Sequence, residues 1–188
     1  MGKTVFLNQE KSTVFRVVVY GPESTGKTTL CQDLAAHYKT HWVPEFARDY
    51  LQKKWNNSQQ VCSLDDLPVI AKGQMDSENT IVKKTDKILF CDTNILVTQI
   101  WSETHFEGYC DPEIIAAANE LHYDLYLLTG IDIPWEPDDL RDRPTDREFM
   151  FQCFENKLME HKKPYLHIIG SRENRIKLAT NAIDSIIL

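Results

Sequence analysis

The sequence lacks paired cysteines, an excess of basic residues and any long apolar run. Its five cysteines are scattered and form no C-x-x-C motif. A disulfide framework and a zinc site are therefore not expected, and a reducing cytoplasm is the favoured location. No apolar stretch approaches the roughly 18 residues of a membrane-spanning helix, and the N-terminus is too short and too polar for a signal peptide. We therefore predict a cytoplasmic protein with no membrane partner.

Acidic residues outnumber basic ones by 28 to 21, and the formal net charge is −7. Binding to a nucleic-acid backbone needs a basic surface, so no nucleic-acid partner is predicted. The chain has 188 residues, of which 42% are hydrophobic and 26% charged, with no internal repeat and no low-complexity linker. These values are typical of one soluble globular domain, expected here over residues 1–188. The oligomeric state stays open.

The central motif is Gly21–Thr28, which matches G-x-x-x-x-G-K-[ST], the Walker A pattern of a phosphate-binding loop (P-loop). A β-branched stretch, Phe15–Tyr20, precedes it, and apolar residues at helical spacing follow it. We expect Lys27 to reach the β- and γ-phosphates of ATP and Thr28 to hold Mg²⁺. The residues expected to bind the ATP phosphates are Gly21, Glu23, Ser24, Thr25, Gly26, Lys27, Thr28 and Thr29. The alternative is a glycine turn beside an exposed lysine.

Strands and helices alternate along the rest of the chain. Apolar runs predict further strands at residues 41–44, 87–92, 123–129 and 165–170, and an extra edge strand at 4–7. Helices are expected behind the P-loop, from about residue 45, and at 63–82, 95–101, 112–121, 145–158 and 171–186, with a loop at 55–60. This order predicts an α/β fold with a doubly wound, mainly parallel five-stranded sheet flanked by helices.

Local signals mark several helix ends. Asp111 followed by Pro112, the capping-box sequence 145–148, and Ser171 each predict a helix start. The last helix is expected to bury Ile176, Ala179, Ile183 and Ile186, and Gly73 is a weak spot in the helix over 63–82. Residues 130–147 break the alternation, with three prolines and many charges, and are expected to form a lid or binding loop.

Two acids follow strands whose ends should meet at the P-loop edge of the sheet. Asp92 ends an apolar strand, as a metal- or substrate-binding acid would, or it caps the next helix. Glu45 is the predicted catalytic base and acceptor-binding residue, with Asp49 as the second choice. A first-turn acid, favoured by the helix dipole, is the alternative for Glu45. Asn94 is expected either to bind substrate or to be a simple first-turn residue.

Arginines and a tryptophan complete the candidate site. Arg141 and Arg143 are predicted to stabilise the charge of the transferring phosphoryl group, with Arg147 less strongly favoured. The alternative is a solvated charged loop, because acids alternate with these arginines. Arg48 is expected to pair with Glu45 or to bind substrate. Trp135 either stacks on a substrate base or anchors the loop to the domain.

These motifs together resemble the nicotinamide riboside kinase (ribosylnicotinamide kinase) domain of the NadR-type bacterial NAD biosynthesis proteins, within the P-loop nucleoside-kinase-like ATPases. The resemblance rests on G-P-E-S-T-G-K-T-T-L at 21–30, E-x-x-R-D-Y at 45–50, F-x-D-T-N-x-x-x-T at 90–98 and P-W-x-x-D-x-L-R at 134–141. It implies transfer of the ATP γ-phosphate to the 5′-hydroxyl of nicotinamide riboside, giving nicotinamide mononucleotide. It also implies that the cofactors are ATP and Mg²⁺ and that the acceptor is a nucleoside-type small molecule.

The sequence departs from that family at positions that are expected to contact the acceptor. Asn94 stands where a second acid is often found, and Pro44 stands where an aromatic residue is expected to stack on the nicotinamide, with Phe46 as its replacement. The nucleotidyltransferase domain that usually precedes this kinase is not in the sequence, so a free-standing kinase or a relative with another acceptor is expected. The alternatives are a kinase for another nucleoside or nucleotide and a regulatory P-loop ATPase without a small-molecule acceptor.

Overall fold

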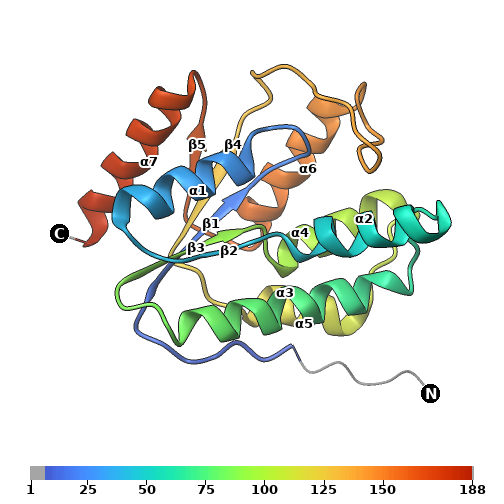
Figure 1. Ribbon diagram of the computed structural model, residues 1–188, viewed down its shortest axis with the longest axis horizontal. Helices are drawn as coiled ribbons and strands as arrows, with labels where there is room; N and C mark the ends of the chain where they lie inside the picture. The colour runs from blue at the N-terminus through green and yellow to red at the C-terminus, as the bar shows by residue number, and fades with distance from the viewer. Residues whose placement is uncertain (1–6, 188) are drawn as a thin grey trace.

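Five parallel strands form the sheet of the computed structural model, which describes residues 7–187. Their order is β2-β3-β1-β4-β5, with the strand that leads into the P-loop at the centre (Figure 1). The strands are β1 (Phe15–Tyr20), β2 (Trp42–Val43), β3 (Ile88–Asp92), β4 (Leu125–Thr129) and β5 (Tyr165–Ile168). The five predicted core strands are thus confirmed. The extra edge strand expected at residues 4–7 lies outside the described residues, apart from Leu7.

Helices cover both faces of this sheet, as expected for a doubly wound fold (Figure 1). The helices are α1 (Lys27–Tyr38), α2 (Phe46–Ser58), α3 (Asp66–Val82), α4 (Ile95–His105), α5 (Pro112–Glu120), α6 (Arg147–Glu160) and α7 (Arg172–Ile187). Helices α1 and α7 pack side by side on one face, and α3 to α6 pack on the other.

The alternation of side chains along β1 explains why both faces are covered. Val17 and Val19 belong to the core cluster under α1 and α7, whereas Val18 and Tyr20 belong to the cluster on the opposite face. Successive side chains of a strand point to opposite faces, so a strand that is apolar throughout must be buried on both. Parallel pairing with β3 and β4 then brings the carboxyl ends of three strands to one edge.

Several predicted helix ends are confirmed and three details are wrong. The Asp111 carboxylate accepts from the Glu113 N–H at 2.8 Å, and the Ser171 hydroxyl accepts from the Asn174 N–H at 3.2 Å. The predicted loop at 55–60 is mostly helix, because α2 continues to Ser58 and ends where Gln59 adopts a left-handed conformation with φ 54°. Lys54, near that end, is held by an ion pair with Asp66 at 2.5 Å.

The other two errors concern α6 and α7. The capping box at 145–148 does not form: α6 begins after Asp146, which makes no side-chain cap bond and instead pairs with Arg143 at 3.3 Å. Ile186, in the last turn of α7, is exposed rather than buried.

Gly73 in α3 has a packing role that its sequence context does not reveal. A Cβ atom built there would lie 2.3 Å from the ring of Phe46, at the start of α2. An alanine normally stabilises a helix interior by about 1 kcal/mol relative to glycine. Because overpacking costs about 1–3 kcal/mol, we expect Gly73→Ala to lower the free energy of unfolding by about 1 kcal/mol, measured by urea denaturation.

The Phe46→Ala background provides the control for this substitution. There the ring is gone, so Gly73→Ala is expected to be neutral or stabilising, following helix propensity alone. A stabilising effect of Gly73→Ala in the otherwise unchanged protein would contradict the packing role of Gly73.

Candidate active site

The P-loop turns sharply between β1 and α1, and two of its glycines are required by geometry. Gly21 has φ 144°, and a Cβ atom there would lie 2.5 Å from the Thr129 hydroxyl. Gly26 precedes α1 in a left-handed conformation with φ 77°. The buried Thr25 hydroxyl donates to the Pro22 carbonyl at 2.8 Å and lies 2.7 Å from the Thr129 hydroxyl. These contacts tie the loop to the end of β4.

Lys27 and Thr28 begin α1 and lie where the sequence predicted them. The Lys27 ammonium donates to the Pro22 carbonyl at 2.8 Å, so its side chain lies along the loop. The Thr28 hydroxyl donates to Asp92 Oδ2 at 2.5 Å. Asp92 is buried at the end of β3, and its other oxygen, Oδ1, has no hydrogen-bond partner among the described residues. A hydroxyl beside a carboxylate with a free oxygen is a donor set that suits Mg²⁺.

A cleft of about 540 Å³ opens in front of the P-loop. It is bordered by the loop, the first turns of α2, α3 and α4, and the segment after β4. From the P-loop it includes Glu23, Ser24, Thr25, Gly26, Lys27, Thr28 and Thr29, and from the other elements Glu45, Arg48, Thr98, Trp101, Arg141 and others. Most of the predicted site residues thus surround one space at the carboxyl edge of the sheet.

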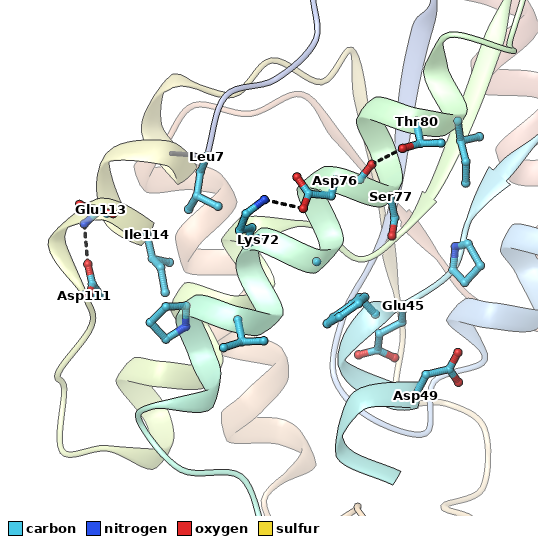
Figure 2. A pocket seen from close by; sticks show the side chains of 16 residues that line it. Leu7, Glu45, Asp49, Lys72, Asp76, Ser77, Thr80, Asp111, Glu113 and Ile114 are labelled. Atoms are coloured by element: carbon cyan, nitrogen blue, oxygen red, sulfur yellow. Dashed lines mark hydrogen bonds and ion pairs between the residues drawn. The ribbon is translucent and has the colours of Figure 1, made fainter. Parts of the chain in front are cut away.

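A second, larger groove of about 950 Å³ lies along α3 and is shown in Figure 2. Glu45 and Asp49 lie at one end of it, and Asp111, Glu113 and Ile114 lie at the other. Among residues 7–187, Glu45 is the one that borders both this groove and the P-loop cleft. The groove contains no P-loop residue, so we place the chemistry in the smaller cleft. Asp49, the second choice for the base, borders only the groove.

Glu45 comes two residues after the end of β2, beyond Pro44, and is half-buried at the N-terminus of α2. Burial is the main cause that raises the pKa of its carboxyl, and the nearby charge of Asp92 raises it further. Lys27, Arg48 and Arg141 act in the opposite direction. The side-chain oxygen Oε1 of Gln74 accepts from the Phe46 N–H at 2.8 Å and so fixes the helix start beside Glu45. A carboxyl whose pKa is raised above its ordinary value suits proton transfer.

Glu23 is a second residue of the same cleft whose carboxyl group has a raised pKa. Burial raises its pKa to about 7, and the charge of Asp142 adds to the shift while that of Lys27 opposes it. One of its oxygens is buried without a hydrogen-bond partner among the described residues. Because a carboxylate repels phosphate, any phosphate contact of Glu23 must come from its backbone N–H.

The raised pKa of Glu23 gives a stability prediction. Between about pH 4.3 and pH 7 the folded protein holds a proton that the unfolded chain releases. This contribution is complete below the unfolded pKa and is lost as the pH rises through about 7. We therefore expect Glu23→Gln to stabilise the protein at pH 8 by about 1–2 kcal/mol, after allowance for solvent screening, and to change little at pH 4.5.

Urea denaturation at pH 4.5 and pH 8 would measure this difference. The exposed Glu120 on α5 offers the control, because Glu120→Gln should show no such pH dependence. Equal effects of Glu23→Gln on the free energy of unfolding at both pH values would contradict the raised pKa of Glu23.

Of the two arginines predicted to be catalytic in the loop after β4, Arg141 borders the cleft and Arg143 does not. Arg141 borders the cleft, and its guanidinium donates to the Glu136 carbonyl. Arg143 lies behind the loop, where it donates to His105 Nε2 at 3.0 Å and to the Thr104 carbonyl at 2.8 Å. The structure therefore gives no support to Arg143 as a catalytic residue. Its role is to fasten the loop to the end of α4.

Arg147 and Trp135 also fasten this loop. Arg147 donates to the carbonyls of Ile133 at 2.8 Å and Ser24 at 3.2 Å, and its guanidinium lies 5.9 Å from the centre of the Trp135 ring. Trp135 does not border the P-loop cleft but a small space behind it. Of the two roles predicted for Trp135, the geometry favours the anchor over stacking on a substrate base.

Asn94 lies in the core and not in the cleft. It is 2% exposed, and its amide donates to the Tyr126 hydroxyl at 3.0 Å. The backbone at Thr93 turns with φ 68°, which directs Asn94 back under the sheet edge. This position speaks against the predicted contact with substrate.

Two residues that the sequence did not single out support the site. Trp101 borders the cleft from α4, and its ring stacks on His105 with 3.8 Å between centroids. Its place on the apolar stripe of α4 predicts a core residue. Arg175 of α7 is 5% exposed and donates to the carbonyl of Thr25 at 2.7 Å and to Asp132 at 2.6 Å. It joins the P-loop to the segment after β4, a contact with no local sequence signal.

Other site classes are not supported over residues 7–187. That part of the chain contains no helix with the length and apolarity to cross a membrane. Nor does it bring three or more histidine, cysteine or acidic side chains together as a metal cluster. All five cysteines are free thiols. The predicted location in the cytoplasm stays a prediction.

The comparisons with known sequences include a family match and two relatives that share one name. A family model described as "AAA domain" matches residues 16–175. The "Trifunctional NAD biosynthesis/regulator protein NadR" of Salmonella typhimurium is 29% identical over 154 residues, which cover 81% of this chain and 37% of that protein. The Escherichia coli protein of the same name is 32% identical over 125 residues, covering 66% and 30%. The chain thus spans about a third of these relatives.

Solved structures with the same fold include two of a NadR protein and one of a nucleoside kinase. The NadR structure in complex with NR has a TM-score of 0.74 at 21% identity and covers 93% of this chain and 52% of that one. The complex with NAD and AMP-PNP has a TM-score of 0.74 at 23% identity, covering 92% and 49%. Deoxyadenosine kinase from M. mycoides has a TM-score of 0.63 at 11% identity, covering 92% and 100%. The P-loop kinase fold is common to all three.

Proposed function

We propose that this chain, which belongs to the AAA domain family, is an ATP- and Mg²⁺-dependent kinase. Its proposed acceptor is the 5′-hydroxyl of nicotinamide riboside. The product is nicotinamide mononucleotide, so the enzyme acts in NAD biosynthesis. The observation that carries this proposal is the shared cleft, in which a carboxyl with a raised pKa, Glu45, borders the same space as Lys27 and Thr28. Phosphate-binding residues beside a general base suit the transfer of a phosphoryl group to a hydroxyl.

The residues in and around the cleft have separate tasks in this reaction. The P-loop and Lys27 bind the phosphates of ATP, and Thr28 with Asp92 would hold Mg²⁺, which supplies charge neutralisation at the phosphates. Glu45 accepts the proton of the 5′-hydroxyl and aligns its oxygen with the γ-phosphorus. Arg141 donates hydrogen bonds to the transferring phosphoryl group. Arg175 keeps the loop in place through Thr25.

The acceptor identity is supported by the relatives rather than by the cleft alone. The curated relatives are named for NAD biosynthesis, and a solved NadR structure of the same fold contains NR, which we take to be nicotinamide riboside. An assay with purified protein, Mg²⁺ and labelled ATP across a panel of nucleosides tests the assignment. Turnover of another nucleoside with none of nicotinamide riboside would favour the other-nucleoside kinase. Hydrolysis to ADP without any phosphorylated acceptor would favour the regulatory ATPase, which no observation here supports.

Trp101 is the aromatic residue best placed to stack on the acceptor base, in place of the aromatic expected at position 44. One face of its ring is covered by His105, and the residue borders the cleft. Base stacking contributes roughly 1–3 kcal/mol. We therefore expect Trp101→Ala to raise the KM for nicotinamide riboside at least tenfold and to change the KM for ATP less than twofold.

Steady-state kinetics with each substrate varied in turn would measure both constants. Trp135→Ala is the comparison, since Trp135 borders the small space behind the loop. A larger acceptor effect for Trp135→Ala than for Trp101→Ala would reverse the assignment of the stacking residue.

A further inference from the structure

We propose that Asp138 determines acceptor specificity by neutralising two cleft arginines, so that the enzyme favours acceptors without a phosphate group. This inference rests on the proposed function, because it concerns the acceptor half of the same cleft. It adds a residue that acts through others, and a selection against nucleoside monophosphates, including the reaction product.

The carboxylate of Asp138 bridges two elements. Its Oδ2 accepts a hydrogen bond from Arg48 Nη2 of α2 at 2.7 Å and forms an ion pair with Arg141 of the loop, whose Nε lies 3.0 Å away. Both arginines border the P-loop cleft, whereas Asp138 does not. Asp138 therefore contacts the two guanidinium groups from outside the cleft. Its single negative charge partly neutralises the two positive charges of Arg48 and Arg141.

The position of Asp138 is fixed by the backbone. Its other oxygen, Oδ1, accepts from the N–H groups of Leu140 at 2.9 Å and Arg141 at 3.1 Å. Burial opposes its charged form, but the bond from Arg48, the backbone bond from Leu140 and the charges of both arginines lower its pKa. Asp138 is therefore ionised at neutral pH and cannot easily swing away from the arginines.

An acceptor phosphate would have to compete with this carboxylate. Paired guanidinium groups bind phosphate strongly because their N–H donors match its oxygens. Here Arg48 already donates a hydrogen bond to Asp138, Arg141 is ion-paired with the same carboxylate, and Arg141 Nη1 donates to the Glu136 carbonyl. The carboxyl of Glu45 adds negative charge nearby when it is ionised. A neutral or cationic acceptor avoids this repulsion, and nicotinamide riboside carries a positive pyridinium ring.

The test compares the dissociation constants of nicotinamide mononucleotide and nicotinamide riboside, measured by calorimetry, in the intact chain and in Asp138→Asn. Asparagine keeps an oxygen for the two backbone N–H groups and removes the charge. We expect the ratio of the two constants, mononucleotide over riboside, to fall at least about tenfold, because a charge-assisted pair becomes available to phosphate. The fall should shrink as salt rises.

Matched variants separate charge selection from a structural role. Asp138→Glu restores the charge and should keep the ratio near that of the unchanged protein. Asp139→Asn makes the same charge change at the next residue, whose carboxylate accepts from Gln52 at 3.2 Å, and should leave the ratio unchanged. Adding Arg48→Gln to Asp138→Asn should abolish most of the gain. A general loosening of the loop would weaken both ligands and could not strengthen mononucleotide binding.

Two results would overturn the proposal. One is a ratio that does not fall in Asp138→Asn, and the other is an equal fall in Asp139→Asn. If Asp138→Asn does not fold, Arg48→Gln alone decides, because a tenfold rise of the ratio would mean that Arg48 already binds the phosphate despite Asp138. Since the measurement is of binding, it is independent of turnover. Absence of nicotinamide riboside phosphorylation would count against the proposed function and not against the charge selection.

Discussion

Replacing Lys27 by alanine is expected to lower phosphoryl transfer at least a hundredfold. Lys27 is the cation of the P-loop that begins α1, and removal of one such charged donor from a transition state costs about 10²–10³ in rate. The loop itself should survive the change, because its shape depends on the contacts of Gly21 and Thr25 with Thr129. Initial rates at saturating ATP and acceptor would measure the loss.

Lys72 offers the matched control for this substitution. It is an exposed lysine on α3, paired with Asp76 at 2.5 Å and remote from the P-loop cleft. Lys72→Ala should retain nearly full activity. If Lys27→Ala kept more than about a tenth of the activity, the assignment of the P-loop as the donor site would be wrong.

The second large effect is expected for Glu45→Gln. Loss of a general base lowers turnover by about 10²–10⁴, whereas the affinity for ATP should change little, because Glu45 lies on the acceptor side of the cleft. The change should also remove a feature of the pH profile. With Glu45 present, kcat falls as the pH drops through a pKa that burial raises above the usual carboxyl range. With glutamine, that limb disappears.

Asp49→Asn is the control for the choice of base. Asp49 lies one turn further along α2, is exposed, and borders the groove of Figure 2 rather than the P-loop cleft. It should therefore have a small effect on kcat. A larger loss in Asp49→Asn than in Glu45→Gln would transfer the role of the base to Asp49. A collapse of ATP affinity in Glu45→Gln would instead make Glu45 a structural or metal-linked residue.

The proposed active site has acids with raised pKa values on both the ATP side and the acceptor side. Glu23, Glu45 and Asp92 all have raised pKa values, with burial as the leading cause. A rise in pH is therefore expected to lower the stability of the protein and to favour catalysis. Above about pH 7 the ionised Glu23 costs stability, while ionised Glu45 is the form that accepts a proton.

Local sequence patterns were sufficient for the strands of the sheet and for the position of the P-loop between β1 and α1. The P-loop motif, the apolar runs of the five strands and the acids at two strand ends are short-range signals, and the parallel order brings those ends together. The errors at residues 55–60 and 145–148 arose where a cap or loop signal was overruled by side-chain contacts. Lys54 of α2 pairs with Asp66 of α3, and Asp146 pairs with Arg143 three residues earlier.

The sequence by itself determined that a strand, a phosphate loop and a helix occur in order, and that Glu45 and Asp92 follow strands of one sheet. The tertiary structure alone decided which side chains face the cleft. Arg141 faces it while Arg143 does not, Trp101 borders it while Trp135 does not, and Asn94 is buried beside Tyr126. The physical reason is that residues 130–147 have no regular secondary structure before α6. The direction of each side chain there depends on partners far away in the sequence, such as Arg48 for Asp138 and Ser24 for Arg147.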